Sequence, residues 1–185
     1  MRFDAVVGNP FDTVPQQAAA LERLGYGGVH ATELTHDPFL TCALAVQGTS
    51  SADVGTQIAV AFARNPMSVA LAARDLQDLS AGRFVLGLGT QVEAHITRRF
   101  SMPWGQPAER VAEFIQAVRA IWQAWETGER LRFTGRFYQH TLMTPTFSPG
   151  PAPAGLPPIH LAAVGPRMAE TAGSVADGVL SLIHI

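Results

Sequence analysis

Short apolar segments alternate with longer segments of helical periodicity, and this alternation limits the possible folds more than any other feature. Repeated strand–helix units with apolar strands predict an α/β protein, in which helices cover a parallel sheet. The predicted strands span residues 3–7, 28–31, 54–62, 83–88, 159–164 and 178–182. The predicted helices span residues 14–24, 38–46, 66–79 and 168–175, and a fifth carries Val111, Phe114, Ile115, Val118, Ile121, Trp122 and Trp125 on one face, which we expect to pack into the core.

Two architectures agree with this alternation. A doubly wound sheet is complete at 185 residues, whereas an eightfold TIM barrel needs about 250. The chain supplies five strand–helix units and a sixth strand, and it ends inside an apolar strand without a helix to cover it. Such an end leaves a bare sheet edge, which favours a TIM barrel truncated after about five units and a sixth strand. We expect residues 1–185 to form one incomplete domain.

The last six residues, Leu180 to Ile185, read LSLIHI. This string is similar to the translation of a transposon-end adapter used in sequencing libraries. We therefore expect a truncated reading frame, with authentic sequence up to about Val179 and a non-native tail over residues 180–185.

The composition excludes several classes of function. Fifteen acidic and 13 basic residues give a net charge of −2, so neither a nucleic acid nor a membrane is an expected partner. A single cysteine, Cys42, excludes an intrachain disulfide and a cysteine-based zinc site, and the six histidines show no paired metal spacing. No apolar run reaches the ~18 residues of a membrane span. The start of the chain lacks an apolar export signal, so we expect a cytoplasmic protein without a metal.

Catalytic groups of barrel enzymes lie on the loops that follow the carboxyl ends of the strands. Glu33, His36 and Asp37 follow the second predicted strand, where they could bind a polar ring or move a proton. The alternative, slightly favoured on spacing alone, is that Asp37 caps the next helix while the other two side chains are solvated. Arg64, after the third strand, could hold an anion, although a surface arginine is the commoner meaning.

Two glycine-containing loops follow the next strands. Gly87-Leu88-Gly89 leads into Thr90 and Gln91, which permits close approach of a ligand to the backbone or forms only a tight turn. The Gly165-Pro166 pair precedes a helix and lies next to Arg167. Free N–H groups and the helix dipole make that helix start a candidate phosphate cradle, with a plain short loop as the alternative.

Four stretches together resemble the luciferase-like monooxygenase superfamily, and most closely its F420-dependent oxidoreductase branch. They are ATELTHDPF (31–39), GTQIAVAFARNPMSVALAARDLQDLSAGRFVLGLGTQ (55–91), RRFSMPW (98–104) and PPIHLAAVGPRMAETAGSVADGV (157–179). The order of strand, Asn-Pro, helix, Ser-x-Gly-Arg-Phe, strand and Gly-x-Gly is specific, although each piece alone is weak. The resemblance implies a TIM barrel with an insertion, which we place at residues 129–157.

The resemblance also implies a cofactor across the carboxyl ends of the strands, either F420 or, as the alternative, FMN. It implies a non-prolyl cis peptide bond after the third strand, at Gln57–Ile58 by position, and phosphate contacts from the loops after the fourth and fifth strands. The cofactor-binding residues that it implies are Gln57, Ile58, Ala59, Gly89, Thr90, Gln91, Ala163, Val164, Gly165 and Arg167.

The chain departs from the resemblance at two positions. Many relatives carry a histidine directly after the acid that ends the second strand, and here Leu34 follows Glu33. Some F420 dehydrogenases carry a glutamate soon after Gly-x-Gly-Thr, whereas in this chain Gln91 and Val92 come before Glu93. We expect His36 and Glu33 to be the catalytic residues, with His95 as another proton source.

The expected function is hydride transfer between F420 and a small organic substrate in the full-length form. A homodimer is a candidate oligomeric state of that form. The alternatives are an FMN-dependent monooxygenase and a barrel that binds the cofactor without turnover. We expect the 185-residue product itself to be inactive.

Overall fold

The sheet of this protein is parallel, and its strands follow one another in chain order. In the computed structural model, which describes residues 2–181, the order is β1, β2, β3, β5, β8, β9, with the short β4 also paired to β5. The strands are β1 (Asp4–Val7), β2 (Gly28–Ala31), β3 (Asp53–Thr56), β4 (Ala59–Val60), β5 (Phe84–Gly89), β8 (Ile159–Ala163) and β9 (Gly178–Ser181). Residues 182–185 of the expected non-native tail lie outside the described residues.

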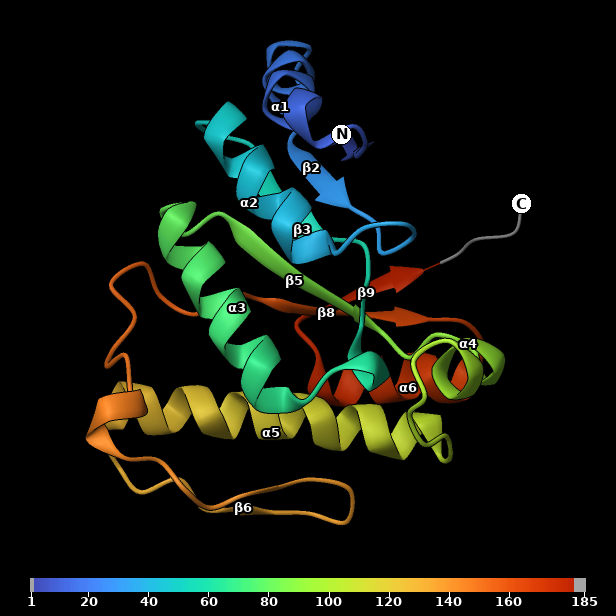
Figure 1. Ribbon diagram of the computed structural model, residues 1–185, viewed down its shortest axis with the longest axis vertical. Helices are drawn as coiled ribbons and strands as arrows, with labels where there is room; N and C mark the ends of the chain where they lie inside the picture. The colour runs from blue at the N-terminus through green and yellow to red at the C-terminus, as the bar shows by residue number, and fades with distance from the viewer. Residues whose placement is uncertain (1, 182–185) are drawn as a thin grey trace.

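Helices lie along one side of this curled sheet (Figure 1). They are α1 (Val14–Arg23), α2 (Pro38–Gly48), α3 (Pro66–Leu79), α5 (Pro107–Thr127) and α6 (Pro166–Val175), whereas the short α4 (Glu93–Arg98) lies beyond the carboxyl end of β5. A doubly wound sheet reverses its strand order and carries helices on both faces. Sequential order with helices on one side is instead the arrangement of a half-barrel, which supports the predicted barrel over the doubly wound alternative.

Local capping explains where α2 and α3 begin. The Asp37 carboxylate accepts a hydrogen bond of 2.8 Å from the N–H of Phe39, and the Asn65 side chain accepts one of 2.9 Å from the N–H of Ser68. Both helices have proline at their first position, where no N–H is needed. Asp37 therefore caps its helix as the alternative interpretation held.

The aromatic face of α5 forms a large part of the core, as predicted. Phe114, Trp122 and Trp125 are buried, and the other predicted members of that face are buried with them. The Trp122 indole donates a hydrogen bond of 3.1 Å to the carbonyl of Ala70 on α3. A buried indole N–H needs such a partner, so this bond fixes how α5 packs on α3.

The predicted single strand over residues 54–62 is wrong. The five steps from Val54 to Ala59 lie opposite only four steps of β5, from Phe84 to Leu88. One extra residue therefore bulges out between β3 and β4, and Ala61–Ala63 turns into a 3-10 helix. Apolar composition alone cannot show such a bulge, because it depends on the neighbouring strands. Helix α4 was also missed, since its six residues are too few for a clear period.

Residues 129–157 interrupt the strand–helix alternation, as predicted. They contain a short antiparallel pair, β6 (Phe133–Thr134) and β7 (Gln139–His140), and a 3-10 turn (Pro145–Phe147). The Glu113 carboxylate on α5 accepts hydrogen bonds of 2.7–2.9 Å from the N–H groups of Arg136, Phe137 and Tyr138. This one side chain ties the tip of the hairpin to the main body.

A second carboxylate clamp joins α1 to the loop before β3. Glu22 accepts hydrogen bonds from the N–H groups of Ser50, Ser51 and Ala52 at distances of 2.7–3.1 Å. The N–H groups of Ala52 and Ser51 lower the pKa of Glu22 from 4.5 to about 2, because they stabilise the ionised form.

We expect this clamp to make stability depend on pH. A depressed pKa in the folded state stabilises the fold above pH 4.5, and this contribution is lost as the pH falls toward about 2. The free energies of unfolding of the full-length form and of its Glu22→Gln variant should therefore differ most at neutral pH and converge between pH 4.5 and 2. Urea titrations at several pH values measure this, and a difference that stays constant with pH would contradict it.

Candidate active site

The predicted site residues come together at one edge of the sheet. Parallel strands in sequential order place all their carboxyl ends at the same edge, and β2, β4, β5 and β8 carry the loops in question there. The pairing of Val60 with Gly89, and of Leu88 with Leu161, sets the three loops that are predicted to bind the cofactor side by side. Their roles stay predictions, but their adjacency is a property of the fold.

Glu33 forms a largely buried ion pair with Arg64, and within residues 2–181 it has no hydrogen bond to His36. The guanidinium donates hydrogen bonds of 2.6 Å to Glu33 and 2.7 Å to Asp37, and the Glu33 carboxylate also accepts one of 2.7 Å from the N–H of Val60. The side chains of Glu33 and Arg64 are only 7 % and 17 % exposed. Neither the solvated Glu33 of the alternative interpretation nor a free anion-binding Arg64 is found.

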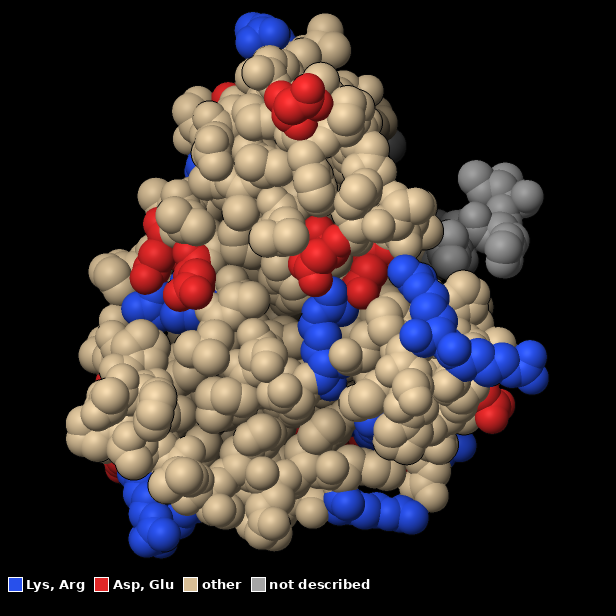
Figure 2. Space-filling view, in the orientation of Figure 1, with Lys and Arg blue, Asp and Glu red and all other residues tan. Residues whose placement is uncertain are grey.

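In this ion-pair triad, the carboxylates of Glu33 and Asp37 compensate the positive charge of Arg64. Burial lowers the pKa of Arg64, but hydrogen bonds and charge from Glu33 and then Asp37 outweigh burial, so the pKa is raised overall. The guanidinium therefore stays charged and committed to the two carboxylates of the β2–α2 loop. On the face shown in Figure 2, basic and acidic side chains are scattered, several lie next to each other, and uncharged surface occupies most of the view.

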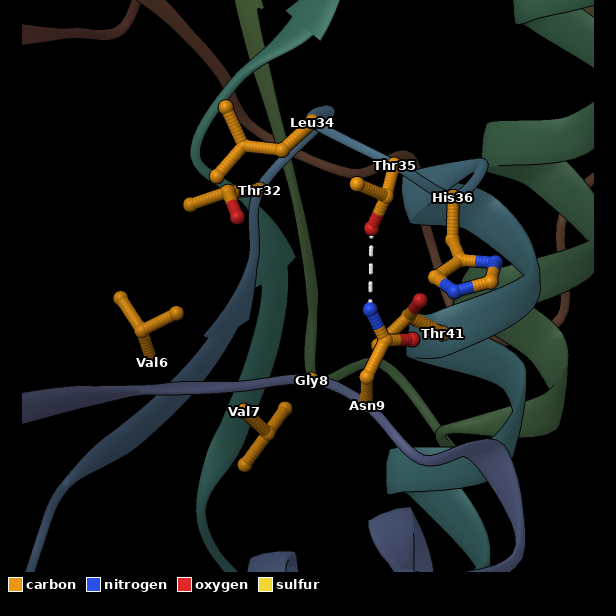
Figure 3. Close-up of a pocket in the computed structure, with 9 residues that line it drawn as sticks. All are labelled: Val6, Val7, Gly8, Asn9, Thr32, Leu34, Thr35, His36 and Thr41. Atoms are coloured by element: carbon orange, nitrogen blue, oxygen red, sulfur yellow. Dashed lines mark hydrogen bonds between the residues drawn. The ribbon is translucent and has the colours of Figure 1, made fainter.

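His36 is exposed and lies on the ring of Phe11, with 4.4 Å between the ring centroids. It lines two pockets, one on each side of the β2–α2 loop. The first, of about 260 Å³, lies between this loop and the segment after β1 (Figure 3). The second, of about 380 Å³, also contains Glu33, Arg64, Arg99 and Phe100. An exposed imidazole at the mouth of two pockets can exchange a proton with a bound molecule.

The Gln57–Ile58 peptide bond is cis, as the resemblance implied. Gln57 is exposed, and its N–H bonds to the carbonyl of Ala31 at 2.7 Å. The Ile58 side chain packs against Gly89, where a Cβ atom would come within 2.8 Å of it. Gly89 therefore permits the close approach of Ile58 to β5, which the Gly-x-Gly pattern alone did not explain.

The loops after β5 and β8 differ in how far their residues are free to contact a ligand. Gln91 adopts a left-handed backbone (φ +62°), and its own side chain accepts a hydrogen bond of 3.0 Å from the N–H of Val92. Gly165 has φ +87° with open space where a Cβ would lie, and it directly precedes α6. The Arg167 guanidinium is exposed and forms an ion pair with Glu109 on α5. The α6 backbone is thus open to a ligand, whereas Arg167 would have to leave Glu109 to reach one.

Sequence reasoning missed several residues around His36. Asn9 donates a hydrogen bond of 2.9 Å to the Thr35 hydroxyl, and Arg99 donates one of 2.9 Å to the carbonyl of Leu34. The Gly8-Asn9-Pro10 turn at the end of the first strand was the available signal for Asn9. Arg99 follows α4, whose position next to the β2–α2 loop only the tertiary structure shows.

The described residues contain neither a metal-binding cluster nor a membrane-spanning helix. Within residues 2–181 no three His, Cys, Asp or Glu side chains are grouped so that they could hold a metal ion. None of the helices in the same residues combines the length and the apolar character that crossing a bilayer needs.

The fold is a parallel half-barrel, and its pockets and polar groups lie at the carboxyl ends of the strands. This is where α/β-barrel proteins carry their functional sites. The chain belongs to the luciferase-like monooxygenase family, which matches residues 3–184.

Two similar sequences and one similar fold are among the proteins that this chain matches. The uncharacterized protein Rv1360 of Mycobacterium tuberculosis is 52 % identical over 97 % of this chain and 53 % of its own length. The F420-dependent hydroxymycolic acid dehydrogenase of the same organism is 34 % identical over 90 % of this chain and 48 % of its own. The oxygenating constituent of 3,6-diketocamphane monooxygenase from Pseudomonas putida, solved with FMN, shares the fold at a TM-score of 0.78 and 15 % identity, over 98 % of this chain and 57 % of that chain. The chain spans about half the length of the curated relatives it matches.

Proposed function

We propose that this chain forms the first part of an F420-dependent oxidoreductase, which moves a hydride between the cofactor and a small organic substrate. The observation that carries the proposal is the 34 % identity to an F420-dependent dehydrogenase, since this relative belongs to the F420 branch. We propose that the protein continues to about the length of its relatives, here called the full-length protein. A cytoplasmic location and a homodimer are further proposals for it.

The residues at the carboxyl edge fit a phosphate-bearing cofactor. Helix α6 has ten residues and begins directly after Gly165, in open space. Its first N–H groups and its positive dipole end suit an anion. We propose that this helix start and the Thr90-Gln91 loop hold the phosphate, while Gln57, Ile58 and Ala59 border the ring, with Ala163 and Val164 completing the β8 side.

When bound, F420 supplies the carbon centre that accepts or gives the hydride. The protein's own residues bind, orient and handle the proton. Exposed His36 is the proposed proton carrier, because its imidazole faces both pockets without a protein hydrogen bond within residues 2–181. Glu33 holds the loop that carries His36 through Arg64 and Asp37, which makes it a positioning residue in this proposal.

Two other functions stay open. An FMN-dependent monooxygenase is favoured by the fold shared with an FMN-bound monooxygenase. A barrel that binds the cofactor without turnover is favoured by Leu34, which occupies the position where many relatives carry histidine. Titrating the full-length protein with F420 and with FMN separates the first two, and turnover of bound cofactor separates the third.

His36→Ala is expected to lower kcat of the full-length enzyme by roughly 100-fold, as the loss of a general acid–base group does. Its affinity for cofactor should change little, because the proposed phosphate seat lies on other strands. Steady-state kinetics between pH 5 and 9, together with a cofactor titration, measure both quantities. Near-normal kcat across this range would show that the proton comes from elsewhere, with His95 as the next candidate.

Arg167→Ala tests the phosphate seat. If the guanidinium leaves Glu109 for the phosphate, its loss should weaken cofactor binding about tenfold, the usual effect of removing a charge-assisted contact. Unchanged affinity would remove Arg167 from the site and leave the backbone of α6 as the anion holder. Arg23→Ala, at an exposed arginine on α1, is the matched control.

A further inference from the structure

The pocket between the segment after β1 and the β2–α2 loop has a composition that restricts its ligand (Figure 3). We propose that it binds an uncharged substrate that carries a hydroxyl or carbonyl group on an apolar body. This inference rests on the proposed function, whose substrate class it names. The volume of about 260 Å³ lies just below the ~300–1,000 Å³ of typical ligand sites, so it suits a small molecule or one end of a larger one.

The two sides of the pocket differ in chemistry. Val6 and Leu34 present apolar side chains on one side in Figure 3, where Thr32 lies beside Leu34, while the buried Val7 points away from Val6. Asn9, Thr35 and His36 present polar side chains on the other. A ligand with an apolar body against Val6 and Leu34, and with a hydroxyl or carbonyl group within reach of these polar side chains and of the Thr32 hydroxyl, matches this lining.

The polar groups have hydrogen-bonding capacity left for a ligand. The Thr35 hydroxyl accepts from Asn9, so its own proton is free to be donated. The Thr41 hydroxyl is already used, since it donates to the carbonyl of Asp37 at 3.2 Å. Within residues 2–181, the Thr32 hydroxyl and the His36 imidazole form no protein hydrogen bond. Hydroxyls and an imidazole can both donate to a carbonyl and accept from an alcohol.

Among residues 2–181, no Lys, Arg, Asp or Glu lines this pocket. The neighbouring Arg64 is neutralised by Glu33 and Asp37, and Arg99 lies in the second pocket, across the loop, with a hydrogen bond to the carbonyl of Leu34. A phosphate or carboxylate would thus lose water here without gaining a paired cation, which is costly. The pocket therefore selects against anionic substrates.

The proposed reaction interconverts an alcohol and a carbonyl compound, and the redox cofactor would accept or donate the hydride. Oxidation of an alcohol breaks one C–H and one O–H bond: the hydride passes to the oxidised cofactor, and the hydroxyl proton passes to the His36 imidazole. The product is the carbonyl compound. Reduction of a carbonyl runs the same transfers in reverse.

The test uses the full-length protein without cofactor and four probes of one shape: cyclohexanol, cyclohexanone, cyclohexyl phosphate and cyclohexanecarboxylate. Calorimetric titration should show saturable binding of the two neutral probes and at least roughly tenfold weaker binding of the two anions. Thr32→Val, which keeps the shape but removes the hydroxyl, should weaken cyclohexanol binding roughly three- to tenfold. Thr134→Val, at an exposed threonine of the β6–β7 hairpin, is the matched control.

Tighter binding of an anion, no saturable binding of either neutral probe, or equal affinities for Thr32→Val and Thr134→Val would overturn the inference. The nuclear magnetic resonance signals of the His36 ring provide a measurement on the unaltered protein, and they should shift with cyclohexanol. A separate F420 titration reports on the proposed function, so the two proposals can fail independently.

Discussion

Expressed alone, the 185-residue chain is expected to form aggregates or loosely packed material without a cooperative thermal transition. Within residues 2–181, β1 pairs only with β2, and β9 pairs only with β8, so the backbone groups of two edge strands are free to pair with other chains. Val6 on β1 is 57 % exposed and Val179 on β9 is 48 % exposed. Size-exclusion chromatography and calorimetry would test this against the full-length protein.

A charged residue on the open edge should reduce this association. Val179→Lys is expected to increase the monomer fraction of the isolated chain, because a lysine on an edge strand opposes pairing. Val92→Lys is the matched control, since Val92 is 56 % exposed but directly precedes α4 and lies in neither of the edge strands β1 and β9. A monomeric chain with a sharp transition and normal cofactor affinity would contradict the prediction.

Arg64→Met is expected to lower the free energy of unfolding of the full-length protein by about 3 kcal/mol. The substitution keeps the apolar part of the side chain but leaves the Glu33 carboxylate, which is 7 % exposed, without its cation. Removing one partner of a buried pair typically costs ~3–5 kcal/mol, and the lower end applies because Asp37 is 41 % exposed. Urea denaturation measures the loss.

A second substitution separates buried charge from packing. Adding Glu33→Gln to Arg64→Met should recover most of the loss, since a neutral amide oxygen can still accept from the N–H of Val60 without a buried charge. If the double variant recovers nothing, the loss comes from packing instead. Arg23→Met, at an exposed arginine, should change stability by less than ~0.5 kcal/mol.

Local sequence patterns predict some features of this fold directly, and the family resemblance predicts another. The strand–helix alternation that predicts a parallel sheet, the cap at Asp37 and the buried face of α5 were predictable, because each is a pattern of residues close together in the chain. Hydrophobic periodicity and capping are local properties. The position of the cis bond at Gln57–Ile58 followed from the family resemblance and not from these patterns.

The tertiary structure decided which polar groups meet. Glu33 and His36 are three residues apart, and the sequence suggested that they act together, yet Glu33 pairs with Arg64, 31 residues further along the chain. The bulge after β3 sets that meeting, because the N–H of Val60 and the guanidinium both reach the same carboxylate. Which carboxylate a cation neutralises depends on strand register and burial, and both arise only when distant segments pack. The sequence by itself thus determined the fold class and the edge where the site lies, whereas packing left His36 exposed beside the pockets.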